Sequence, residues 1–321
     1  MKNIGLEVSE VKIGIKTNSP HLLEKDRFFW LDTNFLSVDK VPFEEAKDSL
    51  VKVWDNIGGT PLEIKRNTLC LRGNFSKLEK EANDPRYSIF GNLGIFSSWV
   101  LRVLEETQNI YTLHACGLVK RNKLIIIPGG AGAGKSVFIL SALRKGWKIF
   151  STEFVHFRVK GGIEFFKGSL KDTVRVDTLK CYFQDVAEEL GISLKAEIGG
   201  KMVVDLSLFQ TDKYQIRPSD VILIFPHVEE RRDRIICEEL KDREILLRKL
   251  FNNASDKIGK SILLYSKLAV PGVDSVRLGQ RRKENLEKFL QSGKVKKSLL
   301  WISGVKEARE IFDRININEF N

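Results

Sequence analysis

A glycine-rich segment near the middle of the chain has the residue types and spacing that hold phosphate. Residues 129–136 read Gly-Gly-Ala-Gly-Ala-Gly-Lys-Ser, the pattern G-x-x-x-x-G-K-S of a P-loop. In such a loop, backbone N–H groups surround phosphate oxygens, the lysine reaches the β- and γ-phosphates, and the serine hydroxyl binds Mg²⁺. The sequence therefore predicts that a nucleotide is bound by Gly129, Gly130, Ala131, Gly132, Ala133, Gly134, Lys135 and Ser136.

The segments on either side of this loop have the pattern that the loop requires. Residues 123–128 form a short apolar run typical of a buried strand. Apolar residues then recur up to Gly146, a residue type that commonly ends a helix. A helix beginning at the loop also directs its positive end toward the phosphates. The order of strand, loop and helix argues against a glycine-rich turn that matches by chance.

The composition is that of a globular protein with an anionic partner. The 321 residues are 42% hydrophobic and 30% charged, enough for one large or two modest domains. Lys and Arg number 53 against 42 acids, a net charge of +11, which favours a nucleotide, a phosphorylated metabolite or RNA as partner. The basic clusters are short and lack interleaved aromatic residues, so nucleic-acid binding is possible but not favoured. A solvated, lysine-rich surface is the alternative explanation.

Targeting and cysteine patterns point to the cytoplasm. No apolar run approaches the roughly 18 residues of a membrane span, and the first residues lack the apolar region of a signal peptide. We therefore expect a cytoplasmic protein with no membrane partner. The four cysteines are far apart and form no C-x-x-C pair, so neither a zinc site nor a redox dithiol is indicated.

The periodicity of apolar residues predicts two regions. Residues 1–92 contain short strand patterns at 11–16 and 68–72 and form a smaller α+β region of unknown role. An apolar stripe over residues 95–104 predicts a helix, which begins a nucleotide-binding domain spanning 93–321. Within that domain we predict strands at 111–119, 148–152, 202–206, 221–226 and 299–302, a hairpin over 154–166, and helices over 179–190, around 246–251 and over 305–315.

The stretch from His114 to Val159 resembles the kinase domain of the HPr kinase/phosphorylase family, whose core is similar to that of phosphoenolpyruvate carboxykinase. The resemblance depends on a histidine in the strand before the P-loop strand, on the loop itself, and on the short distance to Glu153. Only one helix separates Lys135 from this acid, and a hairpin follows it. The resemblance implies an α/β fold with a mixed-sheet P-loop kinase domain, ATP as phosphate donor, Mg²⁺ as cofactor and, in many members, a homo-oligomer.

The chain departs from this family at the end of the strand after the P-loop helix. The family has two adjacent aspartates there, one holding Mg²⁺ and one acting as base toward the acceptor hydroxyl. Thr152 and Glu153 occupy these positions, which leaves one carboxylate. The second family signature, which accompanies phosphorylation of HPr, is also missing. Phosphorylation of HPr itself is therefore not expected. We expect the acceptor to be a different hydroxyl group.

Beyond the loop, five residues are candidates for the site. Glu153 could bind Mg²⁺ through water or act as a general base, and His114 could contact phosphate, steer the acceptor or simply belong to the core. Asp205 lies at a strand end, where its carboxylate could face a cleft or cap a turn. Arg231 and Arg232 follow a buried strand and could neutralise the transferred phosphoryl group, or could lie in a merely basic loop.

The sequence predicts an ATP-dependent phosphotransferase, a kinase that acts on a hydroxyl of a small molecule or of a protein serine. Either ADP or pyrophosphate is an alternative donor. Two other hypotheses remain. The absence of an aspartate at residue 152 suggests a sensor that binds ATP without transferring phosphate, and the charge of +11 suggests a kinase acting on RNA. Both remaining histidines that lie in this domain, His156 and His227, are expected to be structural or at the surface.

Overall fold

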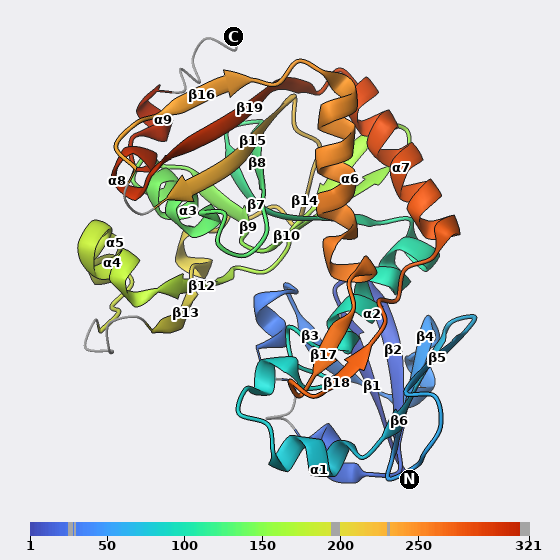
Figure 1. Cartoon of the computed structure of the whole chain (residues 1–321). Coiled ribbons are helices and arrows are strands. Elements are labelled where there is room, and N and C mark those ends of the chain that lie inside the picture. Colours follow the sequence, from blue (N-terminus) through green and yellow to red (C-terminus); the bar gives the residue numbers. More distant parts are fainter. Residues whose placement is uncertain (25–27, 29, 194–199, 230–231, 315–321) are drawn as a thin grey trace. The chain divides into compact units, whose positions relative to one another are not determined.

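The structure is a computed structural model that describes residues 1–24, 28, 30–193, 200–229 and 232–314 (Figure 1). It divides into two compact units. The first comprises Met1–Tyr111 and Ala254–Arg282, and the second comprises Thr112–Asn253 and Lys283–Asn321. The boundary expected at residue 92 thus falls inside the first unit, and a segment from late in the chain returns to that unit. No helix among the described residues has both the length and the apolar character to cross a membrane.

The first unit is built on a six-stranded mixed sheet. Its strands follow the order β3-β1-β2-β4-β6-β5, with bounds β1 Lys2–Val8, β2 Val11–Thr17, β3 Val38–Val41, β4 Ser49–Asp55, β5 Leu62–Lys65 and β6 Thr68–Gly73. In the central strands buried and partly exposed residues alternate, because successive side chains of a strand point to opposite faces. The strands predicted at 11–16 and 68–72 are confirmed as β2 and β6.

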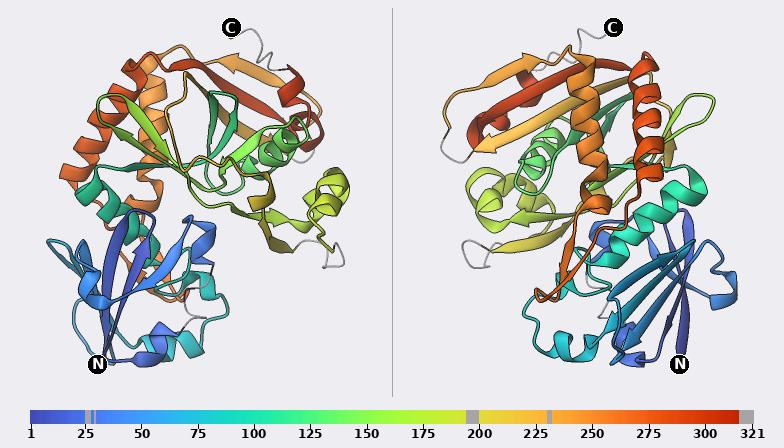
Figure 2. Two further views of the ribbon diagram at one scale, coloured as in Figure 1. Left: turned by 180° about the vertical axis from the view of Figure 1, so that it is seen from behind. Right: turned by 45° about the vertical axis from the view of Figure 1, so that its right-hand side comes forward.

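Helices and one hairpin complete the first unit. Helix α2, Ile95–Val103, is buried along its whole length and continues as a π-helical turn, η6, Leu104–Gln108. The helix predicted from the apolar stripe over residues 95–104 is thus confirmed, and it lies against the sheet (Figure 2). The shorter elements are η1 Pro20–Leu23, η3 Leu31–Thr33, η4 Phe43–Glu45, α1 Phe75–Lys80, η5 Pro85–Tyr87, β17 Ile262–Leu264 and β18 Leu268–Val270.

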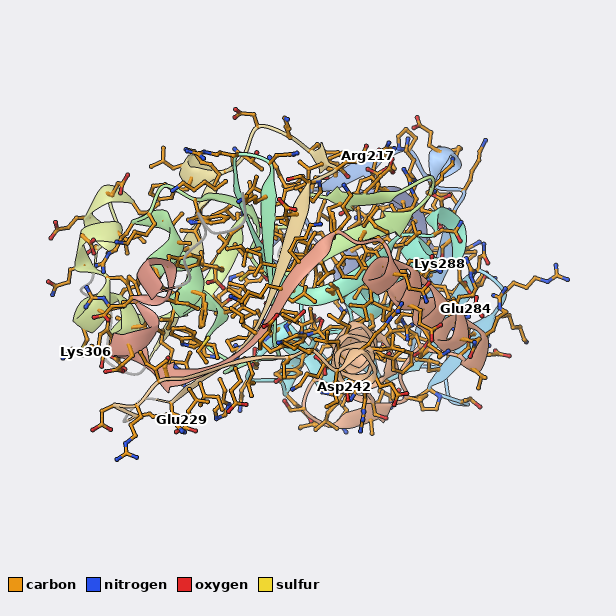
Figure 3. The ribbon with its side chains drawn as sticks, turned by 90° about the horizontal axis from the view of Figure 1, so that it is seen from above. Arg217, Glu229, Asp242, Glu284, Lys288 and Lys306 are labelled. Atoms are coloured by element: carbon orange, nitrogen blue, oxygen red, sulfur yellow. The ribbon has the colours of Figure 1, made fainter. Side chains whose placement is uncertain are left out.

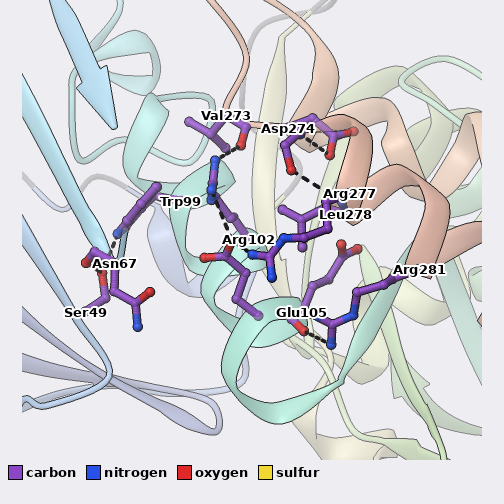
Figure 4. Close-up of polar contacts among 12 residues, drawn as sticks. Ser49, Asn67, Trp99, Arg102, Glu105, Val273, Asp274, Arg277, Leu278 and Arg281 are labelled. Carbon is purple, nitrogen blue, oxygen red and sulfur yellow. Dashed lines mark hydrogen bonds and ion pairs between the residues drawn. The ribbon is translucent and has the colours of Figure 1, made fainter. Parts of the chain in front are cut away.

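Buried polar contacts tie α2 to both parts of the first unit (Figure 4). The indole N–H of Trp99 donates to Ser49 Oγ of β4 at 2.8 Å, and Nη1 of Arg102 donates to the carbonyl of Val273 at 2.6 Å. Arg282 is fully buried and forms ion pairs with Glu105 at 2.8 Å and with Asp274 at 2.9 Å. The returning segment is therefore an integral part of this unit's core.

The second unit contains a nine-stranded mixed sheet. Its path is β14-β11-β10-β7-β8-β15-β19-β16, with β9 paired to β7. The bounds are β7 Tyr111–Lys120, β8 Lys123–Pro128, β9 Lys148–Ser151, β10 Phe154–Val159, β11 Ile163–Phe166, β14 Gln215–Ile216, β15 Asp220–Glu229, β16 Ile236–Glu239 and β19 Val295–Gly304. Strands β8, β15 and β19 are parallel, whereas β7 and β16 pair antiparallel to their neighbours. All strands predicted from the sequence in this region are present.

Helices cover both faces of this sheet (Figure 1). One face packs on α3, Lys135–Leu143, α8, Val305–Ala308, and α9, Ile311–Arg314, through a core that includes Ile127, Ile224 and Trp301. The opposite face meets α6, Arg243–Gly259, and α7, Val276–Gln291. There Phe289 of α7 contacts Phe157 with ring centroids 5.6 Å apart. The result is a three-layer α/β arrangement, as the α/β fold class predicts at its coarsest level.

A small antiparallel pair extends from the second unit beside α3. It consists of β12, Lys171–Arg175, and β13, Lys201–Asp205, with α4, Val176–Tyr182, α5, Gln184–Glu189, and η7, Ser207–Phe209, along the chain. The prediction of one continuous helix over 179–190 is wrong, because two helices are present. Phe183 has a φ of −139° and separates α4 from α5. The closing helix predicted over 305–315 is likewise two short helices, and Ile315 lies outside the described residues.

Candidate functional site

The glycines of the loop are required by its backbone and by its neighbours. Gly132 and Gly134 have φ values of +84° and +98°, a region that L side chains rarely adopt. A Cβ on Gly134 would lie 2.3 Å from Cγ2 of Val228, and a Cβ on Gly129 would lie 2.7 Å from Cβ of Ala133. The loop therefore fits closely against the end of β15, and helix α3 begins directly after it at Lys135.

Two strands hold the ends of the loop. The backbone N–H of Gly129 donates to the carbonyl of His114 on β7 at 3.0 Å, and the N–H of Val228 on β15 donates to the carbonyl of Ala133 at 3.3 Å. The carbonyl of His114 also accepts from the side-chain amide of Asn253 on α6 at 2.8 Å. The loop conformation is thus fixed by the sheet and by a helix on the opposite face.

Three residues expected in the site come together at the base of the loop. His114 Nε2 lies 2.8 Å from Glu153 Oε1, and Lys135 Nζ lies 3.4 Å from Glu153 Oε2 and 3.1 Å from His114 Nε2. The ammonium also donates to the carbonyl of Gly129 at 2.7 Å. Since a neutral imidazole has one N–H, His114 can donate from Nε2 to Glu153 while Lys135 donates to Gly129. The side chain of Glu153 is 24% exposed.

The structure adds a second carboxylate, that of Asp172 on β12, which the sequence analysis missed. Asp172 is 8% exposed and accepts a hydrogen bond from the Ser136 hydroxyl. Its Oδ2 is buried and has no hydrogen-bond partner among the described residues. Burial raises the pKa of Asp172 to about 6, the Ser136 hydrogen bond opposes this rise, and the nearby charge of Glu153 adds to it. One signal was available in the sequence: Asp172 occupies a position between Leu170 and Val174 where an apolar residue would continue the alternation.

Asp205 and Arg232, two further candidates, have partners outside this cluster. Asp205 Oδ1 accepts from the backbone N–H of Ser207 at 2.9 Å, so its carboxylate caps a turn; this is the structural alternative considered for it. Arg232 pairs with Glu229 at 3.2 Å, so its charge is partnered outside the loop. Arg231 lies outside the described residues.

The other histidines of this unit have structural environments. His156 is buried, its Nδ1 lies 2.8 Å from Thr112 Oγ1, and burial lowers the pKa of its ring to about 4. His156 is therefore neutral near pH 7. His227 is largely exposed and lies 2.9 Å from Glu229. Both observations agree with the structural or surface roles expected for these residues.

The oxygen atoms near the loop are of the chemical kind that could hold a magnesium ion together with phosphate. Among the residues that the structure describes, no group of three or more His, Cys, Asp or Glu side chains forms a complete metal cage. Mg²⁺ rarely needs one, because it keeps several waters and is commonly held by one or two carboxylates together with substrate phosphates. The Oδ2 of Asp172, the Ser136 hydroxyl and the carboxylate of Glu153 could serve as oxygen ligands of this kind.

Comparison with models of protein families and with curated proteins found no match for this sequence. The loop and the four ionisable groups beside it (His114, Lys135, Glu153 and Asp172) therefore form the basis for a functional assignment. Together they provide backbone N–H groups and an ammonium for anionic oxygens, oxygen ligands for a divalent cation, and a partly exposed carboxylate that can accept a proton.

Proposed function

We propose that this protein is a Mg²⁺-dependent phosphotransferase that moves the γ-phosphoryl group of ATP to a hydroxyl group. One observation carries the proposal: two carboxylates in different environments lie beside the lysine and the serine of a P-loop. Glu153 contacts Lys135, and Asp172 is hydrogen-bonded to Ser136. The resemblance of residues 114–159 to the HPr kinase/phosphorylase family supports the same reaction class.

The two carboxylates suit different tasks. Asp172 is buried against the serine that would also bind the metal, so we assign it to the metal. Glu153 is partly exposed and its Oε1 is held by His114, so we assign it as the base that accepts the proton of the acceptor hydroxyl. When bound, Mg²⁺ would neutralise charge on the phosphates. Positioning and charge neutralisation are what phosphoryl transfer mainly requires.

Lys135 and His114 complete the arrangement. The ammonium of Lys135 is 3.4 Å from Glu153 and donates to the carbonyl of Gly129, the first residue of the loop, and phosphate oxygens would replace these partners. His114 is 3% exposed and keeps Glu153 oriented through Nε2. A base held in the reactive orientation raises the rate, because the activation free energy no longer includes the entropic cost of aligning it.

The test is transfer of label from γ-labelled ATP with Mg²⁺ to separate pools of small metabolites, proteins and RNA. Wild type is compared with Lys135→Ala, Glu153→Gln and the control Glu239→Gln, which removes a carboxylate from the exposed edge strand β16. We expect labelled acceptor with wild type and with the control. Loss of the general base should lower the rate by roughly 10²- to 10⁴-fold, and loss of Lys135 should abolish binding of the nucleotide.

A protein that binds ATP but labels no acceptor in any pool would be a sensor, and the proposal would be wrong. The RNA alternative gains little from the surface of the second unit. On the side seen in Figure 3, the basic residues Arg217 and Lys288 are present together with the acidic residues Glu229 and Asp242, whereas RNA-binding surfaces concentrate positive charge on one face.

A further inference from the structure

We infer that Thr152 is a positioning residue that fixes Asp172 in the site, so that the carboxylate missing from residue 152 is supplied by a neighbouring segment. This inference rests on the proposed function in one respect, the assignment of Asp172 to the metal. Thr152 has no acid–base chemistry of its own. The inference explains why a threonine can occupy the position before Glu153, directly after β9.

Hydrogen bonds from Thr152 hold the chain directly before Asp172. Thr152 is fully buried. Its backbone N–H donates to the carbonyl of Ser169 at 2.9 Å, and its hydroxyl lies 2.7 Å from the carbonyl of Lys171 and 3.0 Å from that of Ser169. Because the Lys171 carbonyl belongs to the peptide group that leads into Asp172, this hydroxyl sets the orientation of that peptide plane.

The held segment, residues 168–171, also packs closely against the residues on either side of Thr152. A Cβ on Gly168 would lie 2.1 Å from the carbonyl oxygen of Phe154 and 2.4 Å from Ser151 Oγ. The N–H of Gly168 donates to the Phe150 carbonyl at 3.3 Å, and Ser169 Oγ accepts from the N–H of Lys171 at 3.1 Å. The segment has little room to shift, so the end of β9 and the start of β12 form one rigid piece.

This rigid piece carries both carboxylates of the site. Glu153 follows Thr152 in the chain, and its carbonyl accepts from the N–H of Ala115 on β7 at 3.0 Å. Asp172 follows the carbonyl that Thr152 holds. The distance between the proposed base and the proposed metal ligand is therefore fixed through a single residue, which matters because catalytic groups must be held to within fractions of an ångström.

An aspartate could not replace Thr152 in this arrangement. Both side-chain contacts of Thr152 are with carbonyl oxygens, which accept hydrogen bonds and cannot donate them. An ionised carboxylate also only accepts, so an aspartate at this position would place buried oxygens against two carbonyl oxygens without a donor between them. Leaving buried acceptors unpaired destabilises the folded protein. An ionised acid at residue 152 would therefore not hold Asp172 as the Thr152 hydroxyl does.

The experiment measures metal binding rather than turnover. Mn²⁺ binding to the protein with ADP is followed by electron paramagnetic resonance, and binding of a fluorescent ADP analogue is measured without metal. The variants are Thr152→Val, Thr152→Ser and Thr152→Asp. The control is Thr33→Val in the first unit, because Thr33 is also buried and its hydroxyl also donates to a carbonyl, that of Trp30, at 2.7 Å.

We expect Thr152→Val to weaken Mn²⁺ binding by about tenfold to a hundredfold, the usual effect of losing a residue that orients a metal ligand. Nucleotide affinity without metal should remain within about twofold in this variant, because the loop itself is unchanged. Thr152→Ser should restore Mn²⁺ affinity, and Thr33→Val should behave as wild type. Thr152→Asp should bind Mn²⁺ no better than Thr152→Val, although it adds a carboxylate. If Thr152→Val does not fold, Thr152→Ala replaces it.

Two results would overturn the inference: unchanged Mn²⁺ affinity in Thr152→Val, or tighter Mn²⁺ binding in Thr152→Asp than in wild type. The second result would mean that residue 152 itself can supply the metal ligand. Failure of the proposed function looks different, since wild type would then bind ADP and Mn²⁺ as expected of a site yet transfer no label to any acceptor.

Discussion

At the scale of single residues, the buried carboxyl of Asp172, the proposed metal ligand, lowers the stability of the folded protein. Its carboxyl is buried beside Glu153, and both circumstances favour the neutral form, so its pKa rises from 3.8 to about 6 in the folded protein. The folded state therefore holds its proton more tightly than the unfolded state does. This group lowers stability increasingly as pH rises from about 4 to 6, and by a constant amount above that range.

We predict that Asp172→Asn stabilises the protein at pH 8. A shift of about two pKa units corresponds to an upper limit of about 3 kcal/mol, and the gain should disappear below pH 4, where both states are protonated. Urea unfolding at pH 4, 6 and 8 measures it. Asp205→Asn is the control: hydrogen bonds from Ser207 hold the pKa of Asp205 below its usual value, so this change should cost stability at pH 8. Equal effects of the two changes would contradict the prediction.

The loop glycines should differ in their tolerance of a methyl group. Gly134→Ala meets both a positive φ and the side chain of Val228, so we expect at least a hundredfold loss of nucleotide affinity together with lower thermal stability. Gly132→Ala meets only the positive φ, and Gly130→Ala meets neither. Affinity for a fluorescent ADP analogue should therefore be highest for Gly130→Ala, lower for Gly132→Ala and lowest for Gly134→Ala. A Gly134→Ala variant that binds like wild type would show that the loop is not held against β15.

At the scale of elements, the sequence predicted correctly those elements whose formation depends on interactions between residues close together in the chain. The apolar run of β8, the glycines of the loop and the stripe of α2 each reflect a short-range requirement, and all three elements were found. Asp172 was missed because β12 pairs with β13, whose residues lie some thirty positions later, so no short window shows what surrounds it. The break between α4 and α5 was missed for a related reason: apolar residues continue with helical spacing through Phe183, where the backbone leaves the helix.

The ion pairs between α7 and the π-helical turn after α2 give an element-scale prediction. Arg282→Met should destabilise the protein by roughly 3–5 kcal/mol, because it leaves Glu105 buried without its cation. Arg277→Met is the matched control on the same helix: its side chain is 70% exposed and pairs with Glu106, so its loss should cost less than about 1 kcal/mol. Chemical denaturation at pH 8 measures both. Similar costs for the two variants would indicate that Arg282 is not the buried centre of this network.

At the scale of the whole molecule, the chain order of the two units is nested. Both ends of the second unit's inserted stretch, residues 112–253, join segments of the first unit. A boundary drawn from sequence alone assumed one region after another, because nothing in the composition of residues 254–282 marks them as belonging with residues 1–111. Only packing reveals it: Arg102 of α2 requires the carbonyl of Val273, and Glu105 requires Arg282.

This nesting predicts the behaviour of fragments. Residues 1–111 alone should not form a stable fold, since Arg102 and Glu105 would lose their buried partners. Circular dichroism and limited proteolysis measure this. A single chain in which a short Gly/Ser linker joins residue 111 to residues 254–282 should unfold cooperatively, because it contains the complete first unit. A sharp unfolding transition for residues 1–111 by themselves would contradict the assignment of the returning segment to this core.

The carbonyl of His114 accepts both from Gly129 at the start of the loop and from Asn253 of α6. These contacts belong to the main chain and do not depend on which side chain residue 114 carries. Position 114 therefore separates the anchoring of the loop from the proposed chemistry: substitutions there would vary the group that faces Glu153 while the main-chain contacts of the loop remain. For an engineer who wants to vary the proposed reaction, side chains no larger than histidine can be tried here, because residue 114 is buried and packs against Phe154, whereas proline would constrain the strand.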